Sequence, residues 1–256
     1  MLLAVDIGNT NVVFGLFEQD TLVLDARAAS EVSKTSCEWA VFFSGILRLK
    51  GVEPSSISRV VICSVVPPIS RTISNMSREL LKIEPLLIAP GVKTGMPILY
   101  ENPKEVGADR VVNAVAAVNL YGRPVIVVDF GTAVTFDAID HRGRYLGGAI
   151  LPGLVVAAQA LFSRTSKLPM VDISKPPSVI GRNTVDAINA GLYYGYVSLV
   201  QGMVKRFKEV LGEDTKVIAT GGQASMICRE CPCVDAIDPM LTLKGLKILA
   251  DMNPDG

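Results

Sequence analysis

Two distant segments of the chain share one layout. Residues 2–10 and 125–133 each run from an apolar stretch into an Asp-x-Gly sequence and then a Thr. An alternating apolar stretch follows each of them, which predicts a hairpin of two strands joined by a polar turn. Internal repetition constrains the architecture strongly, because each copy has to build the same structural unit. We therefore expect two similar domains, residues 1–118 and 119–256, each of which begins with one hairpin.

The turn of the first hairpin has the composition of a phosphate-binding segment. Gly8 lets the backbone approach a ligand closely because it has no Cβ, and the residues after it offer small hydrogen-bonding side chains. Asp6, at the end of the first strand, can hold a hydrated Mg²⁺, an ion that prefers one or two carboxylates together with phosphate oxygens. The alternative is a hairpin turn with Asx hydrogen bonds and no ligand.

A third element completes an ordered set. Residues 217–224 predict a strand that runs into the Gly221-Gly222 pair. Two Asp-x-Gly turns followed by such a segment resemble the actin, hexokinase and Hsp70 class of ATP-binding proteins. This resemblance implies an α/β fold of two actin-like (ribonuclease H-like) domains that face each other across a cleft. Each domain of that class has a mixed five-stranded sheet with helices.

A long loop rich in Pro and Gly, residues 90–107, precedes an Ala- and Val-rich helix. The charged pair Asp109-Arg110 lies at the start of that helix. Asp109 is a good helix cap, which is one interpretation. Arg110 is unfavourable beside the positive end of a helix dipole, so its position favours contact with an anionic substrate group. A solvated charge is the alternative for Arg110. We expect the helix dipole and Arg110 to favour the ionised form of Asp109.

Periodicity predicts the remaining long elements. Helices are expected over residues 36–50, 71–82, 184–211 and 242–251. Ser36 and Thr184 are the expected N-caps, although the Thr184 hydroxyl can also bind a ligand. Trp39 is expected in the core, and a rigid loop is expected from Pro67. The uncharged residues 145–163 are broken by Gly and Pro, which predicts a Gly-rich loop and then a buried helix rather than a membrane span.

Composition narrows the class of protein. Lys and Arg together number 25, as do Asp and Glu, so there is no net basic charge of the kind that binds nucleic acid. The N-terminus does not resemble a secretion signal, and five Cys is an odd number, so we expect reduced thiols in a cytoplasmic protein. Cys228, Cys231 and Cys233 form C-x-x-C-x-C, for which free thiols and a structural zinc site are both open interpretations; we expect no metal there.

Four short segments together resemble the type III pantothenate kinase family over essentially the whole chain. They are Asp6-Ile7-Gly8-Asn9-Thr10-Asn11, Gly107-Ala108-Asp109-Arg110, Asp129-Phe130-Gly131-Thr132-Ala133 and Gly181-Arg182-Asn183-Thr184. The resemblance implies phosphorylation of pantothenate with ATP, the first step of coenzyme A synthesis, by a homodimer that needs Mg²⁺ and a monovalent cation. The C-x-x-C-x-C segment is not part of this pattern.

The resemblance also implies roles for individual residues. The phosphate-binding segment for ATP is Asp6, Ile7, Gly8, Asn9, Thr10, Asn11, Val12 and Val13, with Thr132 as a further ATP contact. The pantothenate site is Tyr100, Gly107, Ala108, Asp109 and Arg110, with Asp109 as the general base. Asp129 is the implied ligand of K⁺ or NH₄⁺, Asp6 serves Mg²⁺–ATP, and Thr184 reaches pantothenate in the neighbouring subunit.

Two other functions are compatible with this class of sequence. A non-catalytic accessory factor for transcription is one, because the family includes proteins first described in that way; it would require loss of a catalytic residue, and Asp6, Asp109 and Asp129 are present. A related small-molecule or sugar kinase is the other. One such kinase family carries a Cys/His zinc signature, of which the Cys group here lacks the His and Gly.

Overall fold

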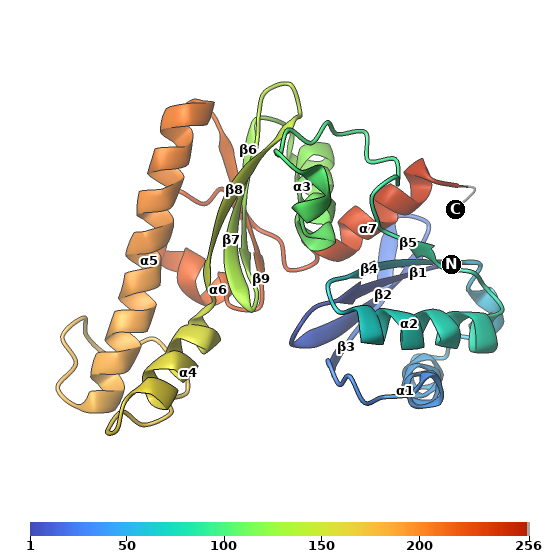
Figure 1. Cartoon of the computed structure of the whole chain (residues 1–256), viewed down its shortest axis with the longest axis horizontal. Helices are drawn as coiled ribbons and strands as arrows, with labels where there is room; N and C mark the ends of the chain where they lie inside the picture. The colour runs from blue at the N-terminus through green and yellow to red at the C-terminus, as the bar shows by residue number, and fades with distance from the viewer. Residues whose placement is uncertain (255–256) are drawn as a thin grey trace. The chain divides into compact units, whose positions relative to one another are not determined.

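The computed structural model describes residues 1–254, which divide into two compact units (Figure 1). Unit 1 contains residues 1–95, 102–116 and 241–254, and unit 2 contains residues 96–101 and 117–240. The boundary expected from the sequence placed all residues after 118 in one domain. The structure instead groups the C-terminal segment with the N-terminal residues, because its helix packs on the first sheet.

Unit 1 is built on a five-stranded mixed sheet. Its strands are β1 (Leu2–Ile7), β2 (Asn11–Glu18), β3 (Thr21–Ala29), β4 (Arg59–Ser64) and β5 (Leu86–Leu87), in the order β3-β2-β1-β4-β5. β1 pairs antiparallel with β2 and parallel with β4. The apolar runs of β1 and β4 suit their central positions, because a strand covered on both faces needs little polar alternation.

Unit 2 repeats this sheet. Its strands are β6 (Val125–Phe130), β7 (Ala133–Ile139), β8 (Tyr145–Pro152), β9 (Lys216–Gly221) and β10 (Ala236–Ile237), in the order β10-β9-β6-β7-β8. β6 pairs antiparallel with β7 and parallel with β9, as β1 does with β2 and β4. The two sheets therefore have the same strand order and directions, which confirms the α/β fold with two mixed five-stranded sheets predicted from the repeat.

In unit 1, helices cover both faces of the sheet: α1 (Ser36–Leu49) and α2 (Pro67–Met76) lie below it in Figure 1, and α7 (Leu241–Met252) lies above it. Trp39 is fully buried in the core formed with α1, as predicted. The N-cap of α1 is Thr35 rather than the predicted Ser36: its side chain accepts from the Glu38 N–H, and Glu38 bonds back to the Thr35 N–H. This capping box satisfies two backbone donors that an isolated Ser36 cap would leave open.

The prediction of a rigid loop at Pro67 was wrong. Pro67 and its neighbour occupy the first two positions of α2, where a missing N–H costs nothing and the fixed φ suits a helix. A π-helical turn, Ser77–Leu81, follows α2. The helix predicted over residues 71–82 therefore exists but begins earlier.

Unit 2 contains α4 (Leu154–Arg164), α5 (Thr184–Leu211) and α6 (Ala224–Ile227), and α3 (Ala108–Tyr121) has residues in both units. The Gly-rich loop predicted after residue 145 is strand β8 instead, because pairing with β7 supplies its backbone hydrogen bonds. The helix predicted to be buried, α4, buries only Leu154 and Ala158. Asn183, not Thr184, is the N-cap of α5, since its side chain accepts the Asp186 N–H at 2.8 Å.

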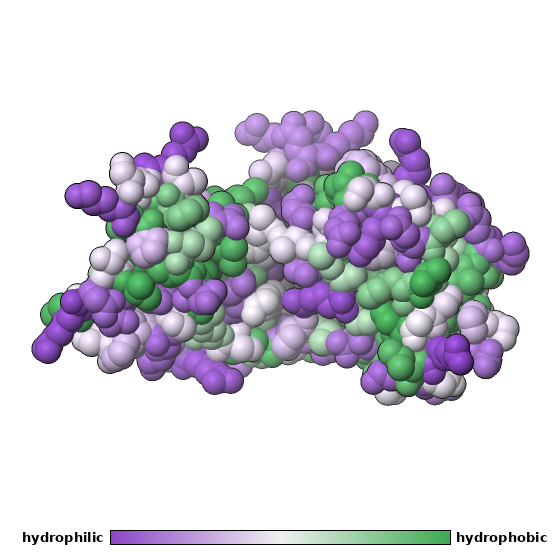
Figure 2. Space-filling model, turned by 90° about the horizontal axis from the view of Figure 1, so that it is seen from below, coloured by the Kyte–Doolittle hydropathy of each residue, from purple (hydrophilic) through white to green (hydrophobic). Residues whose placement is uncertain are grey.

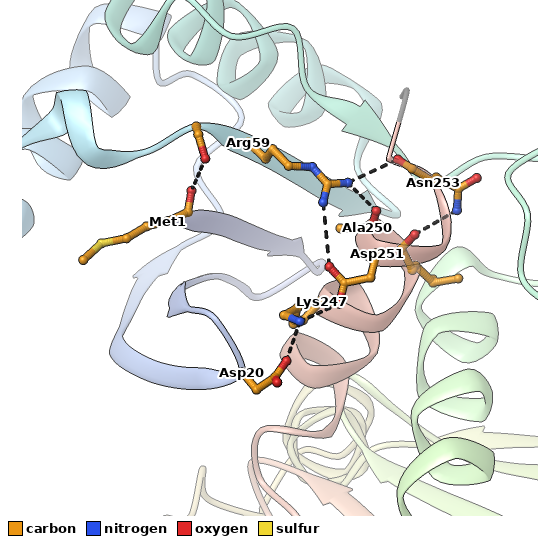
Figure 3. Close-up of polar contacts among 9 residues, drawn as sticks. Met1, Asp20, Arg59, Lys247, Ala250, Asp251 and Asn253 are labelled. Carbon is orange, nitrogen blue, oxygen red and sulfur yellow. Dashed lines mark hydrogen bonds and ion pairs between the residues drawn. The ribbon is translucent and has the colours of Figure 1, made fainter.

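Polar contacts fasten α7 to the strands of unit 1 (Figure 3). The Arg59 guanidinium donates to the Ala250 carbonyl and lies 3.7 Å from the Asp251 carboxylate. Lys247 bonds Asp20 at 2.6 Å and Asp251 at 2.5 Å, and its side chain is only 16% exposed. These contacts hold α7 to the sheet that carries Asp20 and Arg59, in addition to its buried leucines.

Candidate functional site

The turn after β1 is held in shape by backbone bonds and one serine. The Gly8 N–H donates to the Asn11 carbonyl at 2.9 Å, and a Cβ on Gly8 would lie 3.3 Å from that oxygen. The Ser30 hydroxyl, just after β3, donates to the Gly8 carbonyl at 2.6 Å, and the Ser30 N–H donates to the Thr10 carbonyl. The turn is therefore fixed from both sides while Asn9 and Thr10 remain exposed.

Side chains of the predicted ATP segment do not all face the same way. Ile7 and Val12 are fully buried in the core, whereas Asp6 is partly exposed at the end of β1. Only the backbone of Ile7 and Val12 is then available to a ligand. The polar members of the segment carry the side-chain chemistry.

Asp129 occupies the position in unit 2 that Asp6 has in unit 1. Asp6 lies opposite Val13 and Cys63 in its sheet, and Asp129 lies opposite Thr135 and Thr220. The turns also correspond, because the Gly131 N–H donates to the Ala133 carbonyl at 3.0 Å. The repeat seen in the sequence thus places two carboxylates at equivalent strand ends.

Two glycines fit closely around the second turn. A Cβ on Gly221, whose φ is +92°, would lie 2.6 Å from Asp129 Oδ1. Gly153, which precedes α4, donates its N–H to the Thr132 carbonyl at 2.9 Å and leaves no space for a Cβ beside the Gly131–Thr132 backbone. Both glycines therefore let backbone approach the turn where a side chain would displace it.

Asp109 and Arg110 lie in the first turn of α3, as expected. Asp109 Oδ1 accepts the Arg110 N–H at 2.8 Å, and a Cβ on Gly107 would meet that same oxygen at 2.5 Å. Arg110 is only 7% exposed, so its guanidinium is not a solvated surface charge. The Gly107 turn thus gives the Asp109 carboxylate the space it occupies.

The protonation of Asp109 differs from the sequence-based expectation. Burial raises the pKa of the Asp109 carboxyl above its ordinary value of 3.8, and the N–H and charge of Arg110 offset this only in part. The expected dominance of the helix dipole and Arg110 was therefore wrong, because desolvation penalises the charged form more strongly. Asp109 is in consequence a stronger base than an exposed aspartate.

The buried thiol of Cys63 is affected by the charges of both Asp6 and Asp109. Its thiol is fully buried, and its pKa is raised first by burial and then by the negative charges of Asp6 and Asp109. Both carboxylates therefore act on one buried side chain of β4. The end of β1 and the start of α3 form one electrostatic environment in unit 1.

Tyr100 belongs to unit 2. Its segment pairs with β8: the Leu99 N–H donates to the Tyr145 carbonyl at 2.8 Å, and the Tyr100 ring would lie 3.4 Å from a Cβ on Gly147. On the paired strand, the buried Tyr145 hydroxyl donates to Asp137 at 2.6 Å. Tyr100 is thus packed on a strand whose position is fixed by a buried hydrogen bond.

Thr184 is exposed at the start of α5 and lines an open groove of about 820 Å³ in unit 2. Leu161 of α4 and Ile188 of α5 are among its apolar lining residues. Farther along α5, a Cβ on Gly191 or Gly195 would meet nothing within 4 Å. This side of α5 is therefore open to contact by another molecule.

The three cysteines of the C-x-x-C-x-C segment follow α6: Cys228 begins a short 3-10 turn, and Cys231 and Cys233 come after it. Cys228 and Cys231 are buried, and Cys231 donates to the Ile227 carbonyl at 3.5 Å. Within residues 1–254, no group of three or more His, Cys, Asp or Glu side chains is arranged to hold a metal ion. In the same range, no helix is long and apolar enough to cross a membrane.

Sequence reasoning missed three residues around these segments: Ser30, Cys63 and Gly147. Ser30 follows a strand without any turn signature that links it to Gly8. Cys63 is part of an apolar run, although the alternation within β4 could have placed it on the same face as Asp6 of the neighbouring strand. The positive φ of Gly147 has a sequence signal only in the Gly147-Gly148 pair.

Comparison with known proteins identifies a family. A family model described as type III pantothenate kinase matches residues 2–206. The type III pantothenate kinase of Moorella thermoacetica is 49% identical over 253 residues, which cover 99% of this chain and 100% of that protein. The enzyme of the same name from Syntrophotalea carbinolica is 50% identical over 249 residues, covering 97% and 98% of the two chains.

Solved structures resemble the fold at lower identity. A Campylobacter jejuni protein assigned to the Baf family of transcriptional activators aligns with a TM-score of 0.62 at 20% identity, covering 99% of this chain and 100% of that one. Component A of (R)-2-hydroxyglutaryl-CoA dehydratase from Acidaminococcus fermentans aligns with a TM-score of 0.55 at 14% identity, covering 97% and 98%. At these identities the likeness concerns the fold alone.

Proposed function

Because the chain belongs to the type III pantothenate kinase family, we propose that it transfers the γ-phosphoryl group of ATP to the hydroxyl of pantothenate. The products are 4′-phosphopantothenate and ADP, in the first step of coenzyme A biosynthesis. The observation that carries this proposal is the full-length similarity to enzymes of that name, at 47–50% identity. The regulatory alternative is not favoured, because the likeness to the Baf-family protein is one of fold.

Asp109 is the proposed general base. In the reaction the pantothenate hydroxyl oxygen forms a bond to the γ-phosphorus, the bond from that phosphorus to the bridging oxygen of ADP breaks, and the hydroxyl proton passes to an Asp109 carboxylate oxygen. Burial supports this role, because the raised pKa of Asp109 makes its carboxylate a better proton acceptor. Phosphoryl transfer depends mainly on positioning and charge stabilisation, so a late proton transfer to a carboxylate suffices.

The β1 turn is the proposed phosphate-binding segment, with Thr132 as a further ATP contact. The close approach that Gly8 permits and the fixed conformation imposed by Ser30 support this assignment. Asp6 would hold the Mg²⁺ that accompanies ATP, directly or through water, since its carboxylate is partly exposed beside this turn. When bound, Mg²⁺ neutralises developing charge on the phosphate oxygens.

Asp129 is the proposed ligand of a monovalent cation, K⁺ or NH₄⁺. The carboxylate lies against Gly221 at the end of β6, beside the Gly131–Thr132 turn, and an oxygen ligand of this kind suits such an ion. The bound cation would contribute positive charge near the phosphates of ATP. The proposal predicts that activity in Na⁺ buffer is low and rises when K⁺ or NH₄⁺ replaces Na⁺; equal rates in all three would contradict it.

We further propose a homodimer in which Thr184 reaches pantothenate in the neighbouring subunit. Figure 2 shows apolar surface on the part of the molecule that holds α4 and α5. Large exposed apolar residues there include Phe162 at 47%, Val185 at 46% and Ile180 at 75%. Exposed apolar patches mark interaction sites in many proteins. A protein that is monomeric by light scattering and active on dilution would exclude the shared site.

A substrate panel tests the function directly. Purified protein is supplied with ATP and with pantothenate, hexoses or N-acetylhexosamines, and ADP release is measured with a coupled assay. Pantothenate alone should be phosphorylated at a substantial rate. Phosphorylation of a sugar would favour the sugar-kinase alternative, and absence of any turnover would favour the regulatory one.

The Asp109→Asn variant tests the mechanism. Its turnover should fall by roughly 10²–10⁴-fold, the usual contribution of general base catalysis, while ATP still binds. Asp25→Asn is a matched control, because Asp25 is an exposed carboxylate on β3 of the same unit. If Asp109→Asn retains more than about a tenth of wild-type turnover, Asp109 is not the base.

A further inference from the structure

A second groove lies in unit 1, between α2 and the edge of the sheet formed by β4 and β5. It has a volume of about 390 Å³. Three of its lining residues, Ser70, Arg71 and Ser74, come from α2, and Arg78 comes from the π-helical turn that follows it. Ser70 and Arg71 lie four and three residues before Ser74, which places the three side chains on the same side of α2. Hydroxyl and guanidinium donors thus form one wall of the groove.

This groove is separate from the candidate catalytic residues of unit 1. Ile62 of β4 lines it, whereas the neighbouring Cys63 is the residue influenced by Asp6 and Asp109. Successive side chains of a strand point to opposite faces of the sheet. The groove therefore lies on the α2 face of the sheet, and Asp6 and Asp109 act on the other face.

Ser74 presents to the groove a buried hydroxyl that needs a hydrogen-bond acceptor. The residue is 3% exposed, and its Oγ has no hydrogen-bond partner among residues 1–254. A buried hydroxyl without a partner is costly, and native structures rarely keep one without a reason. Because Ser74 lines the groove, an acceptor bound there would satisfy its hydroxyl.

The two arginines that line the groove favour a ligand with a single negative charge. Arg78 donates to both carboxylate oxygens of Glu84 at 2.6 Å and to Asn75 at 3.0 Å, so its charge is already matched. Arg71 is exposed on the same helix face, one turn before Ser74, and forms no ion pair with any residue in the described part of the chain. One guanidinium charge is therefore available to a ligand.

The opposite wall is mostly apolar, and its one hydroxyl, that of Ser64, already donates to the Val66 carbonyl. Ile62 is buried, and Leu87 of the edge strand is 42% exposed. Apolar surface that is exposed beside hydrogen-bond donors suits a ligand with an apolar body and one polar head. Ser74 and Arg71 would contact the head, and Ile62 and Leu87 would contact the body.

We propose that this groove is a binding site for a small organic anion with one oxyanion head, carboxylate or phosphate, on an apolar body. The Ser74 hydroxyl donates to an oxygen of the head, and the Arg71 guanidinium pairs with its charge. The site is additional to the ATP and pantothenate sites proposed above. It lies on α2 and β5, away from Asp109.

Calorimetric titration of the full chain with hexanoate and with hexyl phosphate tests the proposal, with ADP and pantothenate at saturation so that the catalytic site is occupied. At least one probe should bind, and the tighter of the two identifies the head group. Hexanol, which has the same body without a charge, should bind at least about tenfold more weakly, the loss expected when a charge-assisted bond is removed. Equal binding of hexanol, or no binding of either anion, would overturn the proposal.

Two substitutions test whether the anion binds in this groove. Arg71→Gln and Ser74→Ala should each weaken binding of the preferred anion by about tenfold. Ser74→Ala should fold normally, because it removes a buried hydroxyl that has no partner. Arg48→Gln, an exposed arginine on α1 of the same unit, is the matched control and should bind as the wild type does. Unchanged affinity in both Arg71→Gln and Ser74→Ala would refute this location.

Discussion

Substitution of Gly245 by alanine should disturb both stability and catalysis, because Gly245 is where α7 crosses α3 in unit 1. Gly245 is buried, and a Cβ there would lie 2.7 Å from Val112 Cγ1 and closer still to the Val112 carbonyl oxygen. Ordinary van der Waals contact begins at 3.4 Å. The two helices would therefore have to separate locally by roughly 0.7–1 Å.

Forcing an extra carbon into a packed contact typically costs about 1–3 kcal/mol. For a chain of this size, that loss corresponds to a fall in melting temperature of roughly 2–12 °C. The first turn of α3 carries Asp109, three residues before Val112. A displacement near 1 Å at a reacting group can cost about 10²-fold in rate, so turnover should fall by up to that factor.

Thermal unfolding followed by circular dichroism and the coupled ADP assay measure the two effects. Gly45→Ala is the control, because Gly45 lies within α1 and a Cβ there would meet nothing within 4 Å. That variant should be more stable by about 0.5–1 kcal/mol, since alanine favours helix over glycine, with unchanged turnover. A Gly245→Ala protein with wild-type melting temperature and turnover would refute the argument from helix contact.

Three further substitutions test local parts of the structure. Thr35→Ala removes the capping box of α1 and should cost about 0.5–2 kcal/mol in urea denaturation; no loss would mean that the box does not stabilise the helix. Trp39→Ala should cost about 3–5 kcal/mol, because the side chain is fully buried; a cost below about 1 kcal/mol would contradict that packing. Burial tends to raise the pKa of Asp140, but bonds from Arg144 and from backbone N–H groups outweigh it and lower the pKa below 3.8. The stability that Asp140 contributes is therefore present above its unfolded pKa and is lost as pH falls through its lowered folded value. Urea titrations at pH 7 and near pH 3 should show that the stability difference between wild type and Asp140→Asn shrinks at the lower pH; a constant difference would exclude this linkage.

Local patterns in the sequence determined much of this protein. The two Asp-x-Gly hairpins, the α1 face around Trp39, the 28-residue α5 and the closing helix were all predicted from spacing and composition, and the structure contains them. Each depends on residues close together in the chain, so that a run of apolar side chains and its flanking polar residues carry the information. The internal repeat also predicted the topology, because two segments with the same sequence pattern form two sheets with the same strand order.

The errors concern features set by distant partners. Residues 145–152 form a strand because β7 is available to pair with them, which a Gly-rich sequence does not reveal. Pro67 begins a helix because tertiary packing places a helix there, and proline tolerates the first turn. In both places the local sequence allows two conformations, and long-range contacts select one.

The roles of the site residues remain predictions. Their burial and their contacts are set by the tertiary structure. The sequence predicted Asp109 at the start of a helix beside Arg110, and from those neighbours alone its pKa should fall. Burial instead raises it, because the surrounding protein removes water from the carboxyl group. Ser30 fixes the Gly8 turn from a position 22 residues away, and Cys63 lies near two carboxylates from other elements. Desolvation and contacts of this kind depend on the packed chain as a whole, so only the folded structure determines them.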